Sequence, residues 1–389
     1  MPTVQPTIKT PNSREFHDTA EILTGIIVGL GLAATLLTLF AIPLANNMSI
    51  TRDFIEYWAS GQQLVHHASP YDFDAIAAWE QSAGCPKGPA LPMLSPPWIL
   101  PLLYPLGFLG ARIAAVLWNL FLFGCLLLSV HLIRQMHGSP PNRLHWLSIA
   151  FTPVILVLAM GQISILALLG VTLFLRYHEQ RPILSGAALW LCVLKPHLLL
   201  IFLVVLALWI LTTRRYQIAI GAVAAMALST ATALLIEPHA WSEYLHVAQF
   251  SQAVMQFAPC FAGVIRHWIA PQARWLQYLP AAVSSVWAII YYWRHRASWS
   301  WLRHGNLLIL VSLLVAPYGF VYDQCCALPA ILHGVYVTRS RKALAALALL
   351  ILLADIQLFG VSSYSPLSSP HWIWTGLAWI VWYSIVLAV

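Results

Sequence analysis

Residues 113–133 of the chain read IAAVLWNLFLFGCLLLSVHLI, a run of 21 residues without Asp, Glu, Lys or Arg. A helix needs about 20 mostly apolar residues to cross the hydrocarbon core of a bilayer. The run is long enough to do so, and we therefore predict that it forms a transmembrane helix.

The whole chain shares this apolar character. Of its 389 residues, 60% are apolar and 8% are charged, and the mean hydropathy is +0.75. An average soluble domain carries roughly 25% charged residues. This contrast excludes a soluble enzyme and a disordered chain, and the six cysteines are too few for a secreted disulfide scaffold. The sequence predicts an all-α polytopic membrane protein in which residues 1–389 form one multi-span domain.

Eleven further apolar stretches bring the predicted number of transmembrane helices to twelve. The first, Ile22–Pro43, lacks the compact apolar region and cleavage site of a signal peptide, and we predict that it is retained. The others are Leu144–Met160, Ile163–Tyr177, Ile183–Leu194, Leu198–Leu211, Ile218–Ile236, Leu276–Trp293, Leu307–Ala316, Cys325–Val337, Ala343–Phe359 and His371–Ala388.

The charged residues orient these helices. The connections alternate so that 14 of the 20 Lys and Arg residues fall on one side, which the positive-inside rule identifies as cytoplasmic. Nine of the 13 acidic residues fall on the other side. Residues 1–21 then form a short cytoplasmic N-terminus, and the C-terminus is cytoplasmic too. The net charge of +7 is explained by this orientation, and the sequence predicts no nucleic-acid partner.

Two long connections are predicted on the outer face, at residues 44–111 and 237–275. The first contains the apolar segment 95–110, which carries Pro96, Pro97, Pro101 and Pro105. A crossing here would place every later basic connection on the wrong side, so we interpret the segment as re-entrant or interfacial. Non-helical backbone at membrane depth is tolerated only where protein or a water-filled cavity covers it. The segment therefore indicates a cavity that opens outward.

The densest group of polar residues is TRDFIEYWASG at residues 51–61. On a helix, Asp53, Glu56 and Tyr57 share one face. A carboxylate at an apolar boundary is suited to act as a general base, but an Asp three residues before a Glu is equally typical of a helix start. Tyr71 and Asp72 follow in a turn-forming run, where they would either bind substrate or simply shape the loop.

Four further places have both a functional and a structural interpretation. Lys195 and His197 flank Pro196 near the outer boundary, where the lysine would bind a phosphate or extend to the interface. Gln162 lies in an outer turn that is equally typical of a tight hairpin. Asp323 would form part of a site or complement a helix dipole. Arg266, in the second outer connection, would pair with a phosphate or remain solvated.

Other kinds of site have little support in the sequence. His66 and His67 have no companions at metal-ligand spacing, so no metal site and no cofactor are predicted. Cys85 and Cys260 both fall on the outer side, where they would form a disulfide or remain as thiols. No Gly-rich phosphate loop and no GxSxG motif is present.

The order of these motifs resembles that of the polyprenyl-phosphate-dependent glycosyltransferases of the C-type membrane fold, and most closely glycosyltransferase family 87. The similarity lies in residues 53–61, 69–72, 95–97, 161–162, 195–196 and 317–323, within a region from residue 20 to residue 340. It implies a bacterial plasma-membrane enzyme with a cavity at the outer leaflet. It also implies a polyprenyl-phosphate sugar donor, such as a mannose donor, and places the catalytic Asp at Asp53. A polar stretch that usually precedes the family's Arg is reduced here to Gln249–Gln252 before Arg266.

Together these observations predict an inverting sugar transfer to a hydroxyl of a glycolipid or glycan acceptor. Asp53 would be the base, and Lys195, Arg266 and His197, with a pKa near neutrality, would stabilise the leaving phosphate. The other six polar side chains would hold sugar or acceptor hydroxyls: Glu56, Tyr57, Tyr71, Asp72, Gln162 and Asp323. The alternatives are a transporter or flippase, which would carry ionisable groups on broken helices, and a non-catalytic scaffold subunit.

Overall fold

The computed structural model describes residue 25 and residues 29–37, 52–85, 93–250, 257–360 and 369–388. Helices dominate these residues, and no strand occurs among them. Residues 29–37 of the predicted span Ile22–Pro43 are helical, whereas most of the rest of that span lies outside the described residues.

Four described helices are long and apolar enough to cross a membrane. They are α6 (Ala111–Met136), α11 (Tyr216–Ile236), α17 (Arg341–Gly360) and α18 (Ile373–Ala388, with the preceding turn Pro370–Trp372). Many apolar side chains on them are exposed, such as Ile113 and Leu235 at 60% and 85%. Exposed apolar surface of this extent is typical of helices that face lipid. The chain is therefore a helical membrane protein, while the count of twelve spans remains a prediction.

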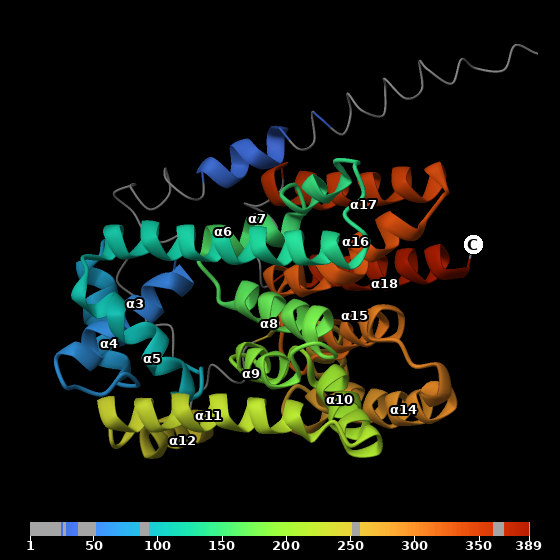
Figure 1. Cartoon of the computed structure of the whole chain (residues 1–389). Coiled ribbons are helices and arrows are strands. Elements are labelled where there is room, and N and C mark those ends of the chain that lie inside the picture. The colour runs from blue at the N-terminus through green and yellow to red at the C-terminus, as the bar shows by residue number, and fades with distance from the viewer. Residues whose placement is uncertain are drawn as a thin grey trace, which may run out of the picture.

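Shorter helices fill the space between the long ones (Figure 1). In Figure 1, α8 and α9 lie between α6 and α11, and each of the four contacts the next in the order α6, α8, α9, α11. The shorter helices of this region are α7 (Thr152–Met160), α8 (Ser164–Tyr177), α9 (Pro182–Cys192), α10 (Leu200–Thr213), α14 (Leu279–His295), α15 (Asn306–Val315) and α16 (Leu328–Val337), with a π-helical turn at Trp301–Gly305 and a 3-10 helix at Val321–Ala327.

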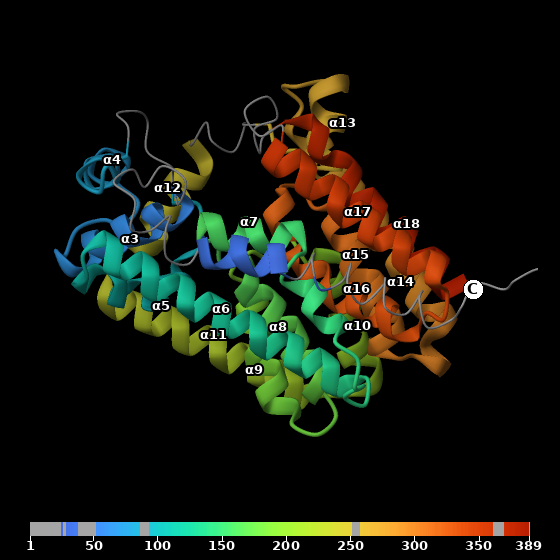
Figure 2. The ribbon, with the colours of Figure 1, turned by 90° about the horizontal axis from the view of Figure 1, so that it is seen from above.

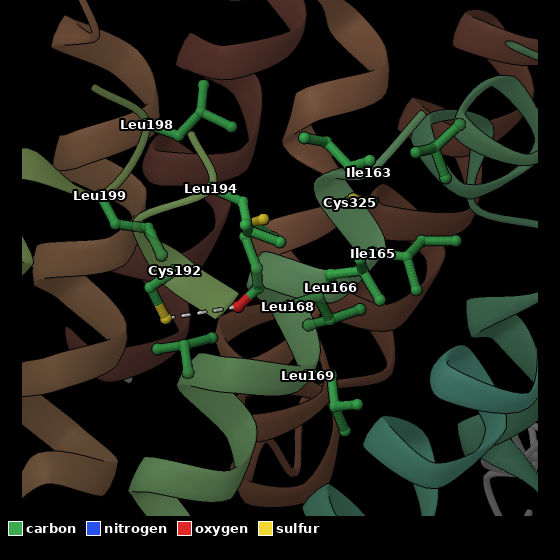
Figure 3. Close-up of a cluster of buried hydrophobic side chains, with 14 of the residues drawn as sticks. Ile163, Ile165, Leu166, Leu168, Leu169, Cys192, Leu194, Leu198, Leu199 and Cys325 are labelled. Carbon is green, nitrogen blue, oxygen red and sulfur yellow. Dashed lines mark hydrogen bonds between the residues drawn. The ribbon is translucent and has the colours of Figure 1, made fainter. Parts of the chain in front are cut away.

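Helix α8 is apolar around its whole circumference because it is surrounded by other helices. Ile165, Leu166 and Leu168 are fully buried, and Figure 3 shows them in one cluster with Leu194 and Leu198. A helix without a polar face is typical of a core position. Here the cluster lies beside the breaks that separate the short helices.

Both predicted outer connections contain helices. The first holds α3 (Arg52–Val65), α4 (Phe73–Ser82) and the segment Pro97–Phe108, and the second holds α12 (Ala240–Phe250) and α13 (Phe261–Ile269). Figure 2 shows α4 and α12 on one side of the molecule and α13 on the other. These regions are therefore folded structure that packs on the membrane helices.

The Pro-rich segment 95–110 forms the short helical run Pro97–Phe108. Four of its 12 residues are α-helical and eight are 3-10 helical, so the run extends about 22 Å at most, less than a bilayer core of about 30 Å. The run packs on α3, where a Cβ added to Gly107 would lie 2.1 Å from the carbonyl oxygen of Gly61. This contact requires glycine. The interpretation of the segment as re-entrant or interfacial remains a prediction.

Candidate active site

Three breaks between short helices meet beside the start of α3. They lie between α7 and α8 at residues 161–163, between α9 and α10 at residues 193–199, and after α15 at residues 316–320. Each break interrupts an apolar helix and places polar side chains among buried neighbours. Backbone that leaves a helix inside a membrane protein must be covered by other protein, which here is supplied by the surrounding helices.

Gly161 shapes the first break. Its φ of +67° lies in the left-handed region, and an added Cβ would lie 2.6 Å from Cβ of Phe54. The indole of Trp118 donates a hydrogen bond to the Gly161 carbonyl at 2.7 Å. The turn therefore needs glycine at this position, and it presents the next residue, Gln162, toward α3.

Gln162 joins two residues of α3 through its side-chain amide. Its Nε2 donates to Oδ2 of Asp53 at 2.8 Å, and its Oε1 accepts from the hydroxyl of Tyr57 at 2.9 Å. Tyr57 and Gln162 are buried, and Asp53 is half-buried. The Asp53 carboxylate only accepts, so it fixes the amide NH2 of Gln162 on its side, and the Tyr57 hydroxyl therefore donates to the amide oxygen. The three side chains form an ordered chain of hydrogen bonds that holds the Asp53 carboxylate in place.

Half-buried Lys195 and buried Asp323 form an ion pair between the second and third breaks. The lysine Nζ lies 2.8 Å from Oδ1 of Asp323, and it also lies over the ring of Tyr322 at 5.1 Å. Oδ1 accepts a further hydrogen bond from the hydroxyl of Ser164, and Oδ2 accepts from the backbone N–H of Phe320 at 2.9 Å. Both carboxylate oxygens of Asp323 are thus bound by the protein, so the side chain holds Lys195 in position.

Two further ionisable groups of the cluster, Glu56 and His197, have pKa values that their surroundings shift. Burial, together with the negative charges of Asp53 and Glu80, holds the pKa of Glu56 well above its usual value. Burial lowers the pKa of His197 to about 4, so the imidazole is neutral at pH 7. The expectation of a near-neutral pKa for His197 was wrong, because the surrounding protein removes water from the ring and disfavours its charged form. It is suited to donate a hydrogen bond but not to act as an acid at neutral pH.

The breaks lie at a defined depth along the long helices. Trp118, which binds the Gly161 carbonyl, comes seven residues after the start of α6. Ser229 comes seven residues before the end of α11 and donates to the carbonyl of Trp98, whose indole donates to the carbonyl of Val193. Seven helical residues rise about 10 Å. The first two breaks therefore lie about 10 Å inside the ends of α6 and α11 that the charge pattern predicts to be outer.

A narrow pocket borders the ion pair. Its lining includes Asp323, Phe320, Cys260 and Leu198, and its volume of about 20 Å³ is close to that of one water molecule. Its walls come from the second and third breaks, from the N-terminus of α13 and from α18. A pocket of this size is too small to hold a sugar.

Tyr71 and Asp72 have other partners. The Tyr71 hydroxyl donates to the carbonyl of Ser95 at 3.1 Å, and Oδ1 of Asp72 accepts from the backbone N–H groups of Asp74 and Ala75 at 3.0 and 3.1 Å. Asp72 is the N-cap of α4. These contacts favour the structural interpretation of both residues.

Arg266 and the two outer cysteines likewise have structural surroundings. Arg266 is buried on α13 and donates to Oε1 of Gln277, whose Nε2 donates to the carbonyl of Pro317 at 2.7 Å. Through Gln277 it supports the third break, which favours a supporting role over direct contact with a phosphate. Cys85 and Cys260 are buried, and the structure contains no disulfide between them.

Four residues of the cluster were not identified as site residues from the sequence: Ser164, Phe320, Tyr322 and Tyr318, whose ring lies 5.9 Å from that of His197. Ser164 directly follows the Gly161–Gln162 turn, and the other three lie in the run Pro317–Asp323 that ends at the ion-paired carboxylate. Their position next to these motifs in the sequence is the feature that could have identified them as site residues. Among the described residues, no group of three or more His, Cys, Asp or Glu side chains is placed to hold a metal ion.

The family model of glycosyltransferase family 87 matches residues 94–317, more than half of the chain. The chain belongs to glycosyltransferase family 87. The matched region of this family 87 chain contains Gln162, Lys195 and Arg266, whereas Asp53 and Asp323 lie outside it on either side. No curated protein and no solved structure matches the chain significantly.

Proposed function

We propose that the protein transfers a sugar, such as mannose, from a polyprenyl-phosphate donor to an acceptor hydroxyl of a glycolipid or glycan at the outer face of a bacterial plasma membrane. Family membership makes the chain a glycosyltransferase. The observation that supports the lipid donor is the position of the polar cluster, about 10 Å inside the ends of the long helices. At that depth a phosphate near the headgroup region would reach the cluster while its polyprenyl chain remains in hydrocarbon.

Asp53 is the proposed general base. Its carboxylate accepts the proton of the acceptor hydroxyl while the acceptor oxygen forms a bond to the anomeric carbon. The bond between that carbon and the phosphate oxygen breaks, and polyprenyl phosphate leaves with the electron pair. A single displacement of this kind inverts the anomeric centre. The hydrogen bond from Gln162 holds Oδ2 of Asp53, so the carboxylate does not have to reorient when the acceptor arrives.

Lys195 is the proposed partner of the leaving phosphate. An ammonium group has three N–H donors, and Asp323 takes up one of them at 2.8 Å. Lys195 would therefore donate to the phosphate without leaving Asp323, and its orientation is already fixed when negative charge develops on the leaving group. Preorganised donors of this kind often supply the largest part of catalysis. Neutral His197 would add a hydrogen bond, and Glu56 and Tyr57 would contact sugar or acceptor hydroxyls.

Such helix breaks also occur in transporters, which place ionisable groups between half-helices. The ion pair of Lys195 and Asp323 fits that description as well as it fits an enzyme. Membership of a glycosyltransferase family decides for the enzyme.

The test uses purified protein in lipid nanodiscs, radiolabelled polyprenyl-phosphate mannose and a mixed lipid extract. Asp53→Asn should lower the transfer rate by about 100-fold or more, the usual contribution of a general base. Asp74→Asn is the matched control, because Asp74 is exposed in the first turn of α4, and it should leave the rate unchanged. Full activity of Asp53→Asn would assign the base elsewhere. If the protein moved label only from a nucleotide-activated sugar, the proposed donor would be wrong.

A further inference from the structure

A second, larger pocket lies at the opposite end of the short helices from the active site. Its volume is about 380 Å³, and it lies between the C-terminal ends of α16 and α18 and the residues just before α15. Its polar lining consists of Ser300, Arg303 and His333. The charge pattern predicts that this end of the molecule is cytoplasmic. None of these residues takes part in the proposed transfer reaction.

A chain of hydrogen bonds fixes the protonation of the histidine in this pocket. Nδ1 of His137 lies 2.8 Å from the carbonyl of Ile133, which only accepts, so Nδ1 carries the hydrogen. Burial lowers the pKa of His137, so its ring is neutral and its Nε2 is an acceptor. Nε2 lies 2.8 Å from Nδ1 of His333, which must therefore donate. The hydrogen of neutral His333 is thus on Nδ1, and its Nε2 is an acceptor.

The pocket therefore has two chemically different sides. The guanidinium of Arg303 and the hydroxyl of Ser300, both on exposed residues, are donors suited to an anion. Nε2 of His333 is an acceptor and requires a donor from its ligand. The C-terminal ends of α16 and α18 also border the pocket, and the negative end of a helix dipole favours a cation. A ligand that satisfies both sides carries a phosphate and a donating cation.

The rest of the lining is apolar and consists of Leu302, Val337, Val386 and Leu387. The neighbouring face of α18 exposes Val381 and Ile385, each at 55%, which is typical of a helix surface in contact with lipid. The pocket is thus bordered by membrane-facing surface on one side and by charged groups on the other. Such a boundary lies at the depth of phospholipid headgroups.

We propose that this pocket binds the headgroup of a phospholipid that carries a phosphate and a primary ammonium, as in phosphatidylethanolamine. The phosphate contacts Arg303 and Ser300, and an ammonium N–H donates to Nε2 of His333. The acyl chains extend along Val337 and the exposed face of α18. Phosphatidylcholine has the same charges, but its quaternary ammonium has no N–H, so it leaves the His333 acceptor without a partner.

The test measures lipid binding to the full-length protein by native mass spectrometry in detergent. The ligands are phosphatidylethanolamine, phosphatidylcholine with the same acyl chains, and soluble glycerophosphoethanolamine. We expect phosphatidylethanolamine to bind about tenfold more tightly than phosphatidylcholine, which corresponds to one charge-assisted hydrogen bond. Equal affinity of the two lipids would overturn the role of His333. Equal affinity of glycerophosphoethanolamine and the lipid would show that the pocket takes a soluble headgroup and not a membrane lipid.

Variants separate the two sides of the pocket. Arg303→Gln should weaken binding of both lipids by about tenfold. His333→Phe should remove the preference between the lipids, and His333→Gln, which keeps an acceptor, should restore part of it. Arg296→Gln is the control, because Arg296 is exposed on the same side, stacks on Trp293 at 4.5 Å and is not part of the lining. Unchanged binding in Arg303→Gln would overturn the proposal even if the His333 variants failed to fold.

Discussion

The ammonium nitrogen of Lys195 lies 2.8 Å from Oδ1 of Asp323, although 128 residues separate the two in the chain. The pair connects the break between α9 and α10 with the segment that leads into α16. Their side chains are exposed by only 13% and 3%. A buried pair of this kind contributes little to stability as a whole, but the loss of one partner leaves an uncompensated charge.

Asp323→Asn should therefore destabilise the protein by about 3–5 kcal/mol, because Lys195 would remain buried without its counter-ion. The double variant Lys195→Met/Asp323→Asn should recover part of this loss, since it removes the charge as well. Denaturant unfolding in detergent measures both variants. Strict additivity of the two single effects would show that the two residues do not interact.

The chain of hydrogen bonds from Tyr57 through Gln162 to Asp53 predicts a change in pH dependence. Gln162→Glu places a second carboxylate opposite Asp53, which raises the pKa of a carboxyl in that pair. The ascending limb of the pH–rate profile should then move to higher pH, while Tyr57→Phe should lower kcat/KM by about fivefold through the loss of one hydrogen bond. If the pH–rate profile of Gln162→Glu matched that of the wild type, the ionisation of Asp53 would not be the one that limits the rate.

Asp72 should prove to be a stability residue. Asp72→Ala removes the N-cap of α4 and should cost about 1 kcal/mol of unfolding free energy, whereas Asp72→Ser keeps a capping oxygen and should cost less. The transfer rate per folded molecule should be the same in both variants. A higher KM in Asp72→Ala, without a loss of stability, would instead support contact with the substrate.

His197 should make the protein sensitive to acid. Its pKa of about 4 lies below its value in an unfolded chain, about 6.5, so the unfolded state binds a proton first as the pH falls. The contribution of this group to the free energy of unfolding is fully present above pH 6.5 and is lost between pH 6.5 and 4. The loss at pH 5 is about 2 kcal/mol. His197→Asn should therefore show a smaller loss of melting temperature between pH 7 and pH 5. An equal loss in the wild type and the variant would contradict the shift.

The thiols of Cys85 and Cys260 should remain separate. Both are buried and form no disulfide, so reduction should change neither the intact mass nor the gel mobility of the protein isolated from an oxidising compartment. A gain of two mass units on reduction, mapped to peptides containing these residues, would contradict the structure. The variant Cys85→Ser provides the reference for such a mapping.

Much of the architecture follows from the sequence. Uninterrupted apolar runs predict helices such as α6 and α11, and Pro196 predicts the break between α9 and α10. The structure confirms these features, because an apolar run and a proline each affect the backbone of their own segment, whatever the rest of the fold. The predicted span Ile183–Leu194 shows the limit, since α9 has only 11 residues. Its apolar character reflects burial between α8 and α11 as much as contact with lipid, and composition alone does not distinguish these surroundings.

The sequence predicts single residues of the candidate site but not which of them contact one another. Four polar residues at apolar boundaries are visible in the sequence: Asp53, Gln162, Lys195 and Asp323. That Lys195 meets Asp323, and that Gln162 meets Asp53, depends on how the helices are arranged around one another. A hydropathy pattern indicates depth in the membrane but not position around the bundle. For the same reason Asp72, which resembled the others in sequence, proved to be a helix cap.

The depth of the polar cluster has a consequence for enzyme kinetics. If the donor reaches Asp53 and Lys195 from within the bilayer, the protein encounters it by two-dimensional diffusion in the membrane plane. The reaction rate then depends on the mole fraction of donor among the surrounding lipids and not on its amount per volume of buffer. Adding inert phospholipid at constant donor should slow the reaction, whereas adding buffer should leave the rate per molecule unchanged. Kinetic constants of this enzyme would then have to be measured at a stated mole fraction of donor in the membrane.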